Sequence, residues 1–183
     1  MNLNNRKIAK ITLEFLAKKS WSSLSTEIIK KKSTLTSFNR IIKSKTDLLK
    51  NINKYFDYIL SLEIKNLENS SKKDMIFEII MMRFDILQVH RKAINSIYKN
   101  FKKNPKDLVF LLPDILQSII LIFKYAKIDT EGIVGPLKIK GIFIIYITTF
   151  FVWKKDNSNS LEKTMTSLDN YLNRADTILK FIN

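Results

Sequence analysis

The chain contains very few residues that interrupt helices. Of its 183 residues, 3 are glycine and 3 are proline, and these two types are the strongest local breaks in regular structure. Between them, apolar residues recur at spacings of three and four, the period of an amphipathic helix, and the alternation typical of strands is almost absent. The pattern predicts an all-α fold.

The rest of the composition limits the kinds of fold and of catalytic or metal site that the chain can form. Because 45% of the residues are hydrophobic, the chain can build a sizeable core, and neither a disordered tail nor a fibre is expected. The absence of cysteine excludes disulfides, thiolate metal sites and a cysteine nucleophile. The single histidine, His90, is expected to be a partly exposed helix residue, and no paired carboxylates, phosphate loop or nucleophile motif is present. We therefore predict no enzyme, no metal and no cofactor.

Two apolar segments bear on whether the chain crosses a membrane. Residues 108–126 are interrupted by Pro113, Asp114 and Gln117, and residues 141–153 span 13 positions, whereas a bilayer core requires about 20 apolar residues in a row. Both are better explained as helices buried in a protein or at a subunit interface. Because the N-terminus also lacks the apolar run of a signal peptide, we expect a cytoplasmic protein with no transmembrane segment.

Positive charge is concentrated near the N-terminus. The chain has 32 Lys+Arg and 17 Asp+Glu, a net charge of +15. Residues 1–60 hold 13 and 4 of these, a net charge of +9, and residues 61–183 hold 19 and 13, a net charge of +6. This distribution predicts a small basic module followed by a larger module that builds the core.

The first module shows one longer helix and two short ones. The apolar face of the first helix is formed by Ile8, Ile11, Phe15 and Leu16. Ser25 favours the start of a second helix that ends near Lys31, and Ser33 with Thr34 can cap a very short third helix at residues 35–42. Two short helices joined by a brief turn and packed on a longer one form the geometry of a helix-turn-helix DNA reader.

The second module is expected to be helical throughout. A fourth helix begins at Thr46, and a long helix begins at Asp74 and ends near Tyr98, before a polar stretch that contains Pro105. Further helices are expected at residues 108–126, 137–153 and 161–182. Asn159 and Glu162, three positions apart, form a predicted capping box for the last of these.

Several short motifs follow one another in the N-terminal third. They are Phe15-Leu16-Ala17-Lys18-Lys19, Trp21, Leu24-Ser25, Ile28, Phe38 and Ser44-Lys45-Thr46-Asp47-Leu48-Leu49. In this order they resemble the TetR family of bacterial transcriptional regulators. That family usually has a glycine between its second and third helices and a tyrosine in the third, where this chain has Lys31-Lys32-Ser33 and Asn39. The resemblance implies a helix-turn-helix domain at residues 1–47 and a helical dimerisation and ligand domain at residues 48–183.

A second group of motifs lies in the C-terminal half. It comprises Met82-Arg83-Phe84-Asp85-Ile86-Leu87, Ile128-Asp129-Thr130 with Gly132 and Gly135, and Val152-Trp153-Lys154-Lys155-Asp156-Asn157-Ser158, followed by Lys163-Thr164-Met165. These resemble a narrower group of regulators, whose C-terminal domain is similar to that of the ubiquinone-biosynthesis accessory lipid-binding proteins. An alternative function follows, namely a lipid- or isoprenoid-binding accessory protein with a degenerate helix-turn-helix.

A helix-turn-helix reader needs base-reading side chains on its third helix and cations or hydroxyls nearby that hold phosphates. Asn39 suits an adenine edge, and Arg40 suits guanine or a phosphate. The candidate DNA-binding residues are Ser25, Lys32, Thr34, Thr36, Ser37, Asn39, Arg40, Lys43 and Lys45. The alternative is a solvated basic face in a lysine-rich protein.

The family resemblance implies a homodimer in which the last two helices pair across a two-fold axis. The candidate interface residues are Ile142, Ile145, Tyr146, Thr149, Phe150, Met165, Leu168 and Leu172. Packing within one subunit is the competing interpretation.

Residues of the second module could also line an apolar cavity for a small apolar or lipid ligand. The candidates are Met81, Phe84, Leu87 and Phe123, with Asp114 and Gln117 as polar anchors. The alternative is that these side chains are ordinary core residues, with Asp114 in the first turn of a helix.

Overall fold

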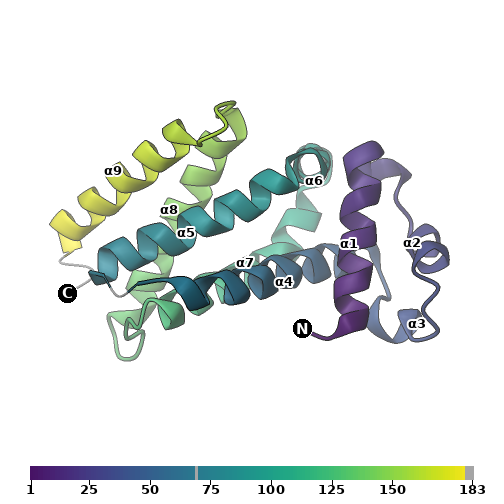
Figure 1. The fold of residues 1–183 in the computed structure, drawn as a ribbon, viewed down its shortest axis with the longest axis horizontal. Helices are drawn as coiled ribbons and strands as arrows, with labels where there is room; N and C mark the ends of the chain where they lie inside the picture. The colour runs from purple at the N-terminus through teal and green to yellow at the C-terminus, as the bar shows by residue number, and fades with distance from the viewer. Residues whose placement is uncertain (69, 180–183) are drawn as a thin grey trace. The chain divides into compact units, whose positions relative to one another are not determined.

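The computed structural model describes residues 1–68 and 70–179, and every regular element in this part of the chain is a helix (Figure 1). The helices in chain order are α1 (Leu3–Lys18), η1 (Trp21–Ser23), α2 (Thr26–Ser33), α3 (Phe38–Ile41), α4 (Lys45–Glu63), η2 (Ile64–Asn66), α5 (Lys72–Val89), α6 (Arg91–Lys103), α7 (Pro105–Tyr125), α8 (Gly135–Lys155) and α9 (Glu162–Leu179). The prediction of an all-α fold is confirmed. The last residues of the helix predicted at 161–182 lie outside the described part.

Contacts divide the chain into two compact units. The first unit comprises residues 1–61 and 86–115, and the second comprises residues 62–85 and 116–183. The boundaries fall inside α4, α5 and α7, so each of these helices contributes residues to both units. The functional division predicted between residues 47 and 48 remains a prediction.

In the first unit, α1 packs against both α2 and α6 (Figure 1). Asn2 caps α1, because its side chain accepts a hydrogen bond of 2.8 Å from the backbone N of Asn5. Of the predicted apolar face, Ile8 and Leu16 are buried and the other two residues are half-buried. The opposing face of α6 is also apolar, and its buried residues include Ala93, Ile94 and Ile97.

The single helix predicted from Asp74 to about Tyr98 is wrong, because the structure has two helices there. His90 separates α5 from α6 with φ −106° and ψ 20°. Its ring lies 5.6 Å from the ring of Phe56 and 6.4 Å from that of Tyr55, both on α4. No glycine or proline marks the break, so the helical pattern of apolar residues continues through it. The tertiary packing of the half-buried His90 ring therefore accompanies a break that the sequence pattern does not indicate.

In the second unit, an aromatic cluster from α5 and α8 occupies the core. The ring of Phe84 lies 5.4 Å from that of Tyr146 and 6.3 Å from that of Trp153. Arg83 is 1% exposed, and it donates hydrogen bonds to the hydroxyl oxygens of Tyr146 at 3.1 Å and Ser118 at 3.2 Å. These bonds connect α5, α7 and α8 within this unit.

The turn between α8 and α9 is organised by one buried carboxylate. Asp156 accepts hydrogen bonds from the backbone N and the hydroxyl of both Ser158 and Thr164. The hydroxyl oxygen of Ser158 also accepts a bond of 3.1 Å from the backbone N of Glu162, the first residue of α9. The structure therefore gives to Asp156 and Ser158 the capping role that we predicted for Asn159 with Glu162.

Two of the described helices, α7 and α8, are long and apolar enough to cross a membrane. In each, 28% of the most apolar stretch is buried. Core helices of soluble proteins also meet this criterion of length and composition, so the predicted absence of a transmembrane segment stays a prediction.

Candidate nucleic-acid interface

The second helix of the predicted motif starts where the sequence indicates. The side chain of Ser25 caps α2, because it accepts a hydrogen bond of 3.2 Å from the backbone N of Ile28. Ile29 is fully buried, whereas Lys31 and Lys32 are exposed. The buried Ile29, with the buried Ser33 at the end of the helix, therefore anchors α2 and leaves its last turn basic.

The turn after α2 contains the strained residue of the motif. Thr34 has φ 55° and ψ 23°, in the left-handed region, and ends α2 as its C-cap. Ser33 is buried, and its hydroxyl donates to the carbonyl oxygen of Lys30 at 2.9 Å. The prediction that Ser33 and Thr34 cap the third helix is therefore wrong, because both residues terminate the second. A β-branched residue is costly in this conformation, which glycine adopts freely.

We expect the Thr34→Gly variant to raise the free energy of unfolding by about 0.5–1 kcal/mol, because relief of left-handed strain of about 1–2 kcal/mol exceeds the entropic cost of glycine of about 0.5–1 kcal/mol. Chemical denaturation at neutral pH measures the change. Thr36→Gly is the matched control: Thr36 is also exposed, but it lacks a positive φ, so the same substitution should destabilise the protein. A loss of stability in both variants would contradict the strain at Thr34.

The third helix is shorter than the predicted residues 35–42. It spans Phe38–Ile41, with Phe38 1% exposed and the following Ile42 3% exposed. These two side chains fix the helix to the core, while Asn39 and Arg40 between them are exposed. Ser37 is half-buried, and its hydroxyl accepts a bond of 3.1 Å from the side-chain amide of Asn4. The two residues predicted to contact bases are therefore presented on the surface by a helix anchored at both ends.

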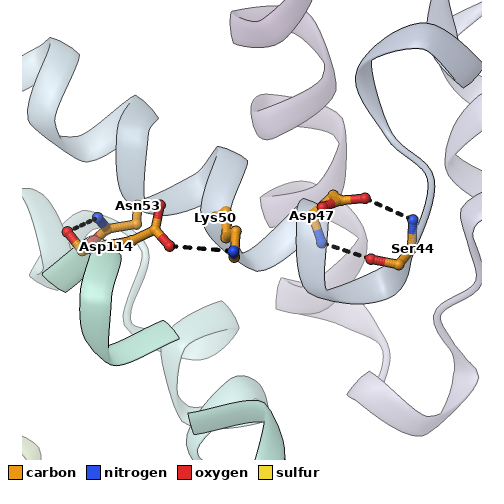
Figure 2. Close-up of polar contacts among 5 residues, drawn as sticks. All are labelled: Ser44, Asp47, Lys50, Asn53 and Asp114. Atoms are coloured by element: carbon orange, nitrogen blue, oxygen red, sulfur yellow. Dashed lines mark hydrogen bonds and ion pairs between the residues drawn. The ribbon is translucent and has the colours of Figure 1, made fainter. Parts of the chain in front are cut away.

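The start of α4 is a reciprocal capping box (Figure 2). The hydroxyl of Ser44 accepts a bond of 3.2 Å from the backbone N of Asp47, whose carboxylate accepts bonds of 2.9 Å from the backbone N of Lys43 and of Ser44. Burial tends to raise the pKa of Asp47, but the bonds from Lys43 and Ser44 outweigh it, so the pKa lies below its usual value. This local structure explains the spacing of serine and aspartate in the motif.

The side chain of Lys45 makes contacts within the first unit. Its ammonium donates to the carbonyl oxygen of Trp21 at 3.0 Å and lies 5.2 Å from the centre of the Trp21 ring. Burial lowers the pKa of Lys45, although the charge of Asp107 opposes the shift. Lys45 therefore joins the start of α4 to η1, and its predicted contact with phosphate remains a prediction.

The predicted DNA-binding residues fall into two groups. The exposed group comprises Lys32, Thr34, Thr36, Asn39, Arg40 and Lys43. Ser25, Ser37 and Lys45 are half-buried and form the intramolecular bonds described above. The exposed group belongs to one continuous segment from the end of α2 to the residue before Ser44, which is the segment that a helix-turn-helix protein presents to DNA.

The division into units sharpens the charge distribution. The first unit holds 19 Lys+Arg and 6 Asp+Glu, a net charge of +13, and the second unit holds 13 and 11, a net charge of +2. Residues 86–115 return to the first unit and bring 6 of its basic residues. The excess charge thus belongs to the unit that contains the helix-turn-helix, to a greater extent than the sequence order indicated.

The predicted ligand residues are distributed over both units. In the second unit, Phe84 and Phe123 are buried, Met81 is half-buried and Gln117 is exposed. In the first unit lie the buried Leu87 and the half-buried Asp114.

Asp114 has structural contacts in the first unit (Figure 2). Its carboxylate is 3.7 Å from the ammonium of Lys50, and its carbonyl oxygen accepts a bond of 3.2 Å from the amide of Asn53. Both partners lie on α4, so Asp114 joins α7 to α4. The ligand pocket remains a prediction.

Most of the predicted dimer residues belong to the core of one chain. Ile142, Ile145, Tyr146, Thr149, Leu168 and Leu172 are buried, Phe150 is half-buried and Met165 is 41% exposed. Instead, the apolar side chains exposed on α8 are Leu137, Ile144 and Phe151. The assignment of the predicted set to a dimer contact stays a prediction.

Among the side chains that the structure describes, no group of three or more His, Cys, Asp or Glu could hold a metal ion. No protein-family model matches the chain, and no curated protein matches it. Among solved structures, the chain is similar to the TetR transcriptional regulator from Nitrosomonas europaea, with a TM-score of 0.74 and 18% identity over 95% of this chain and 98% of that one. The fold is therefore TetR-like, as the order of motifs implied.

Proposed function

We propose that this chain is a TetR-like transcription regulator of the bacterial cytoplasm, which binds a palindromic operator as a homodimer. The observation that carries the proposal is the short helix α3, which presents Asn39 and Arg40 outward between the buried Phe38 and Ile42. The net charge of +13 on the same unit supports a polyanionic partner. The similarity to a TetR regulator over nearly the whole chain supports this function over an enzymatic one.

The experiment that tests the proposal is selection of bound fragments from genomic DNA, followed by a mobility-shift assay at low salt. We expect one enriched palindromic sequence, with the spacing of its half-sites set by the dimer. Failure to shift any enriched fragment, combined with isoprenoid lipid that co-purifies and is found by mass spectrometry, would instead support the lipid-binding alternative. The solved-structure similarity does not favour that alternative.

The homodimer is proposed to form along the uncovered face of α8. Leu137, Ile144 and Phe151 are 52%, 63% and 46% exposed, and they follow one another at spacings of seven, so they share one face of the helix. Met165 on α9 adds a further exposed apolar side chain. Apolar stripes of this kind on a soluble protein are usually covered by a partner, and helix pairing across a two-fold axis satisfies this requirement.

We expect Ile144→Glu to convert the dimer to monomer, because a carboxylate at the centre of the stripe would be buried opposite its own copy. The dissociation constant should rise by at least about 100-fold, as measured by sedimentation velocity over a concentration series. Ile133→Glu is the matched control, since Ile133 is 97% exposed and precedes α8. An unchanged dimer in the Ile144 variant would exclude this face of α8 as the contact.

A further inference from the structure

The first unit carries basic residues on a surface outside the helix-turn-helix. α6 contains Arg91, Lys92, Lys99, Lys102 and Lys103 and no acidic residue. Its four lysines are exposed, whereas its apolar face is buried. A helix that binds a membrane surface needs a free apolar face. The burial of that face in α6 therefore favours a partner that recognises charge alone.

Three of the lysines form a stripe. Lys92, Ser96, Lys99 and Lys103 follow one another at spacings of four, three and four, so they lie along one side of α6. The stripe rises about 16 Å from Lys92 to Lys103, which is the rise of about five base pairs of duplex DNA.

The position of Ser96 places this stripe beside the end of α1. The hydroxyl of Ser96 donates to the carbonyl oxygen of Lys19 at 3.4 Å, and α6 packs against both α1 and η1. The side chains of Lys18 and Lys19, at this end of α1, are exposed. Two elements distant in sequence thus contribute lysines to one region of the first unit.

η1, which contacts α6, connects this region along the chain to α2 of the proposed DNA interface. Ser20, Ser22 and Ser23 around η1 are exposed, and the next capping residue, Ser25, begins α2. Lysine ammonium and serine hydroxyl groups are the side chains that hold DNA phosphates without reading sequence. The exposed surface between the α6 stripe and α2 therefore has the chemistry of a phosphate contact.

We propose that Lys92, Lys99 and Lys103 of α6, with Lys18 and Lys19, bind the phosphate backbone of duplex DNA beyond the bases that α3 reads. The inference rests on the proposed function. It assigns to α6 a contact that is independent of sequence, lengthens the DNA footprint and increases the salt dependence of binding.

The test compares the wild type with the variant Lys92→Glu/Lys99→Glu/Lys103→Glu on a long duplex of random sequence over a series of salt concentrations. We expect binding at low salt to weaken at least about 10-fold, and the slope of log affinity against log salt to fall in magnitude by about 2–3. A short duplex limited to one half-site should show a much smaller difference. The matched control, Lys65→Glu/Lys72→Glu/Lys124→Glu, makes the same change in net charge at exposed lysines of the second unit.

The outcomes separate this inference from the proposed function. If the wild type binds DNA and the α6 variant keeps the salt slope of the control, the α6 contact is wrong and the regulator proposal stands. If the wild type binds no duplex, both proposals fail. Binding of the wild type to vesicles of phosphatidylserine, lost in the α6 variant while DNA binding is retained, would assign the stripe to lipid headgroups and overturn the DNA contact.

Discussion

Replacement of Asp156 by alanine is expected to lower the free energy of unfolding by about 3 kcal/mol, out of a typical total of about 5–15 kcal/mol. The carboxylate is fully buried and accepts four hydrogen bonds, at 3.1 and 2.6 Å from Ser158 and at 2.9 and 2.8 Å from Thr164. Thr164 is itself fully buried. The alanine variant therefore leaves buried donors without their acceptor, which costs more than the bonds alone contribute.

The effect of Asp156→Ala should depend on pH. Burial acts to raise the pKa of Asp156, but the hydrogen bonds from Ser158 and Thr164 outweigh it and hold the pKa far below its usual value. A depressed pKa in the folded state means that the stabilisation is complete above the unfolded pKa of about 3.9 and is lost as the pH falls below it. The difference in stability between wild type and variant should thus be largest near neutral pH and shrink in acid.

Urea denaturation of both proteins at neutral pH and near pH 3 measures this difference. Asp169→Ala is the matched control, because Asp169 is an exposed carboxylate on α9, and its loss should change stability by no more than about 0.5 kcal/mol. Asp156→Asn should have an intermediate effect. The amide keeps one acceptor oxygen, but its NH2 group replaces the other oxygen and faces the donors of Ser158 or Thr164. Equal stability of the Asp156 and Asp169 variants would show that the α8–α9 turn does not depend on the carboxylate.

The region around Asp156 shows which parts of a helical fold can be predicted from a sequence. The C-terminal helices follow from their apolar periodicity, and the predicted start of the last helix at Leu161 is one residue from the observed Glu162. The capping residue is less visible, because Asp156 lies six residues before the helix that it stabilises. Its bonds to Thr164 need a turn whose path is set by tertiary contacts, and local capping rules describe only partners a few residues apart.

The helix-turn-helix shows the same limit. Ser25 is a local signal and caps the second helix as predicted, whereas the burial of Phe38 and the capping box of Ser44 with Asp47 became clear only in the structure. The turn was harder to predict, because a glycine normally marks a left-handed residue and Thr34 takes that conformation without one. The sequence pattern consequently predicts a third helix from residue 35 with Ser33 and Thr34 as its caps, whereas residues 34–37 form the turn.

The feature that was hardest to predict from the sequence is which unit carries the positive charge, because this depends on the fold. Sequence order assigned the basic excess to the first 60 residues, because charges were counted along the chain. The break at His90 separates α6 from α5, and α6 packs on α1, so its lysines join the first unit. A break without glycine or proline has no signal in the sequence, and the basic surface of α6 could therefore not be predicted.

The largest expected functional effect is on operator binding by the double variant Asn39→Ala/Arg40→Ala. Both side chains are exposed on α3, while the anchors Phe38 and Ile42 are untouched, so the fold should be preserved. A bidentate contact of asparagine with adenine or of arginine with guanine contributes about 1–3 kcal/mol of discrimination. Loss of both should weaken binding to the selected operator by at least about 100-fold.

Affinity for a random duplex separates base contacts from phosphate contacts in this variant. Removal of two base contacts should leave binding to random DNA within about threefold of the wild type, because that binding depends on phosphate charge. Arg174→Ala is the matched control for the loss of one exposed arginine, since Arg174 lies on α9 in the second unit. Fluorescence anisotropy with operator and random duplexes at one salt concentration gives both affinities. If the double variant weakens both duplexes equally, Asn39 and Arg40 hold the backbone, and sequence must be read by other residues of the segment between α2 and α4.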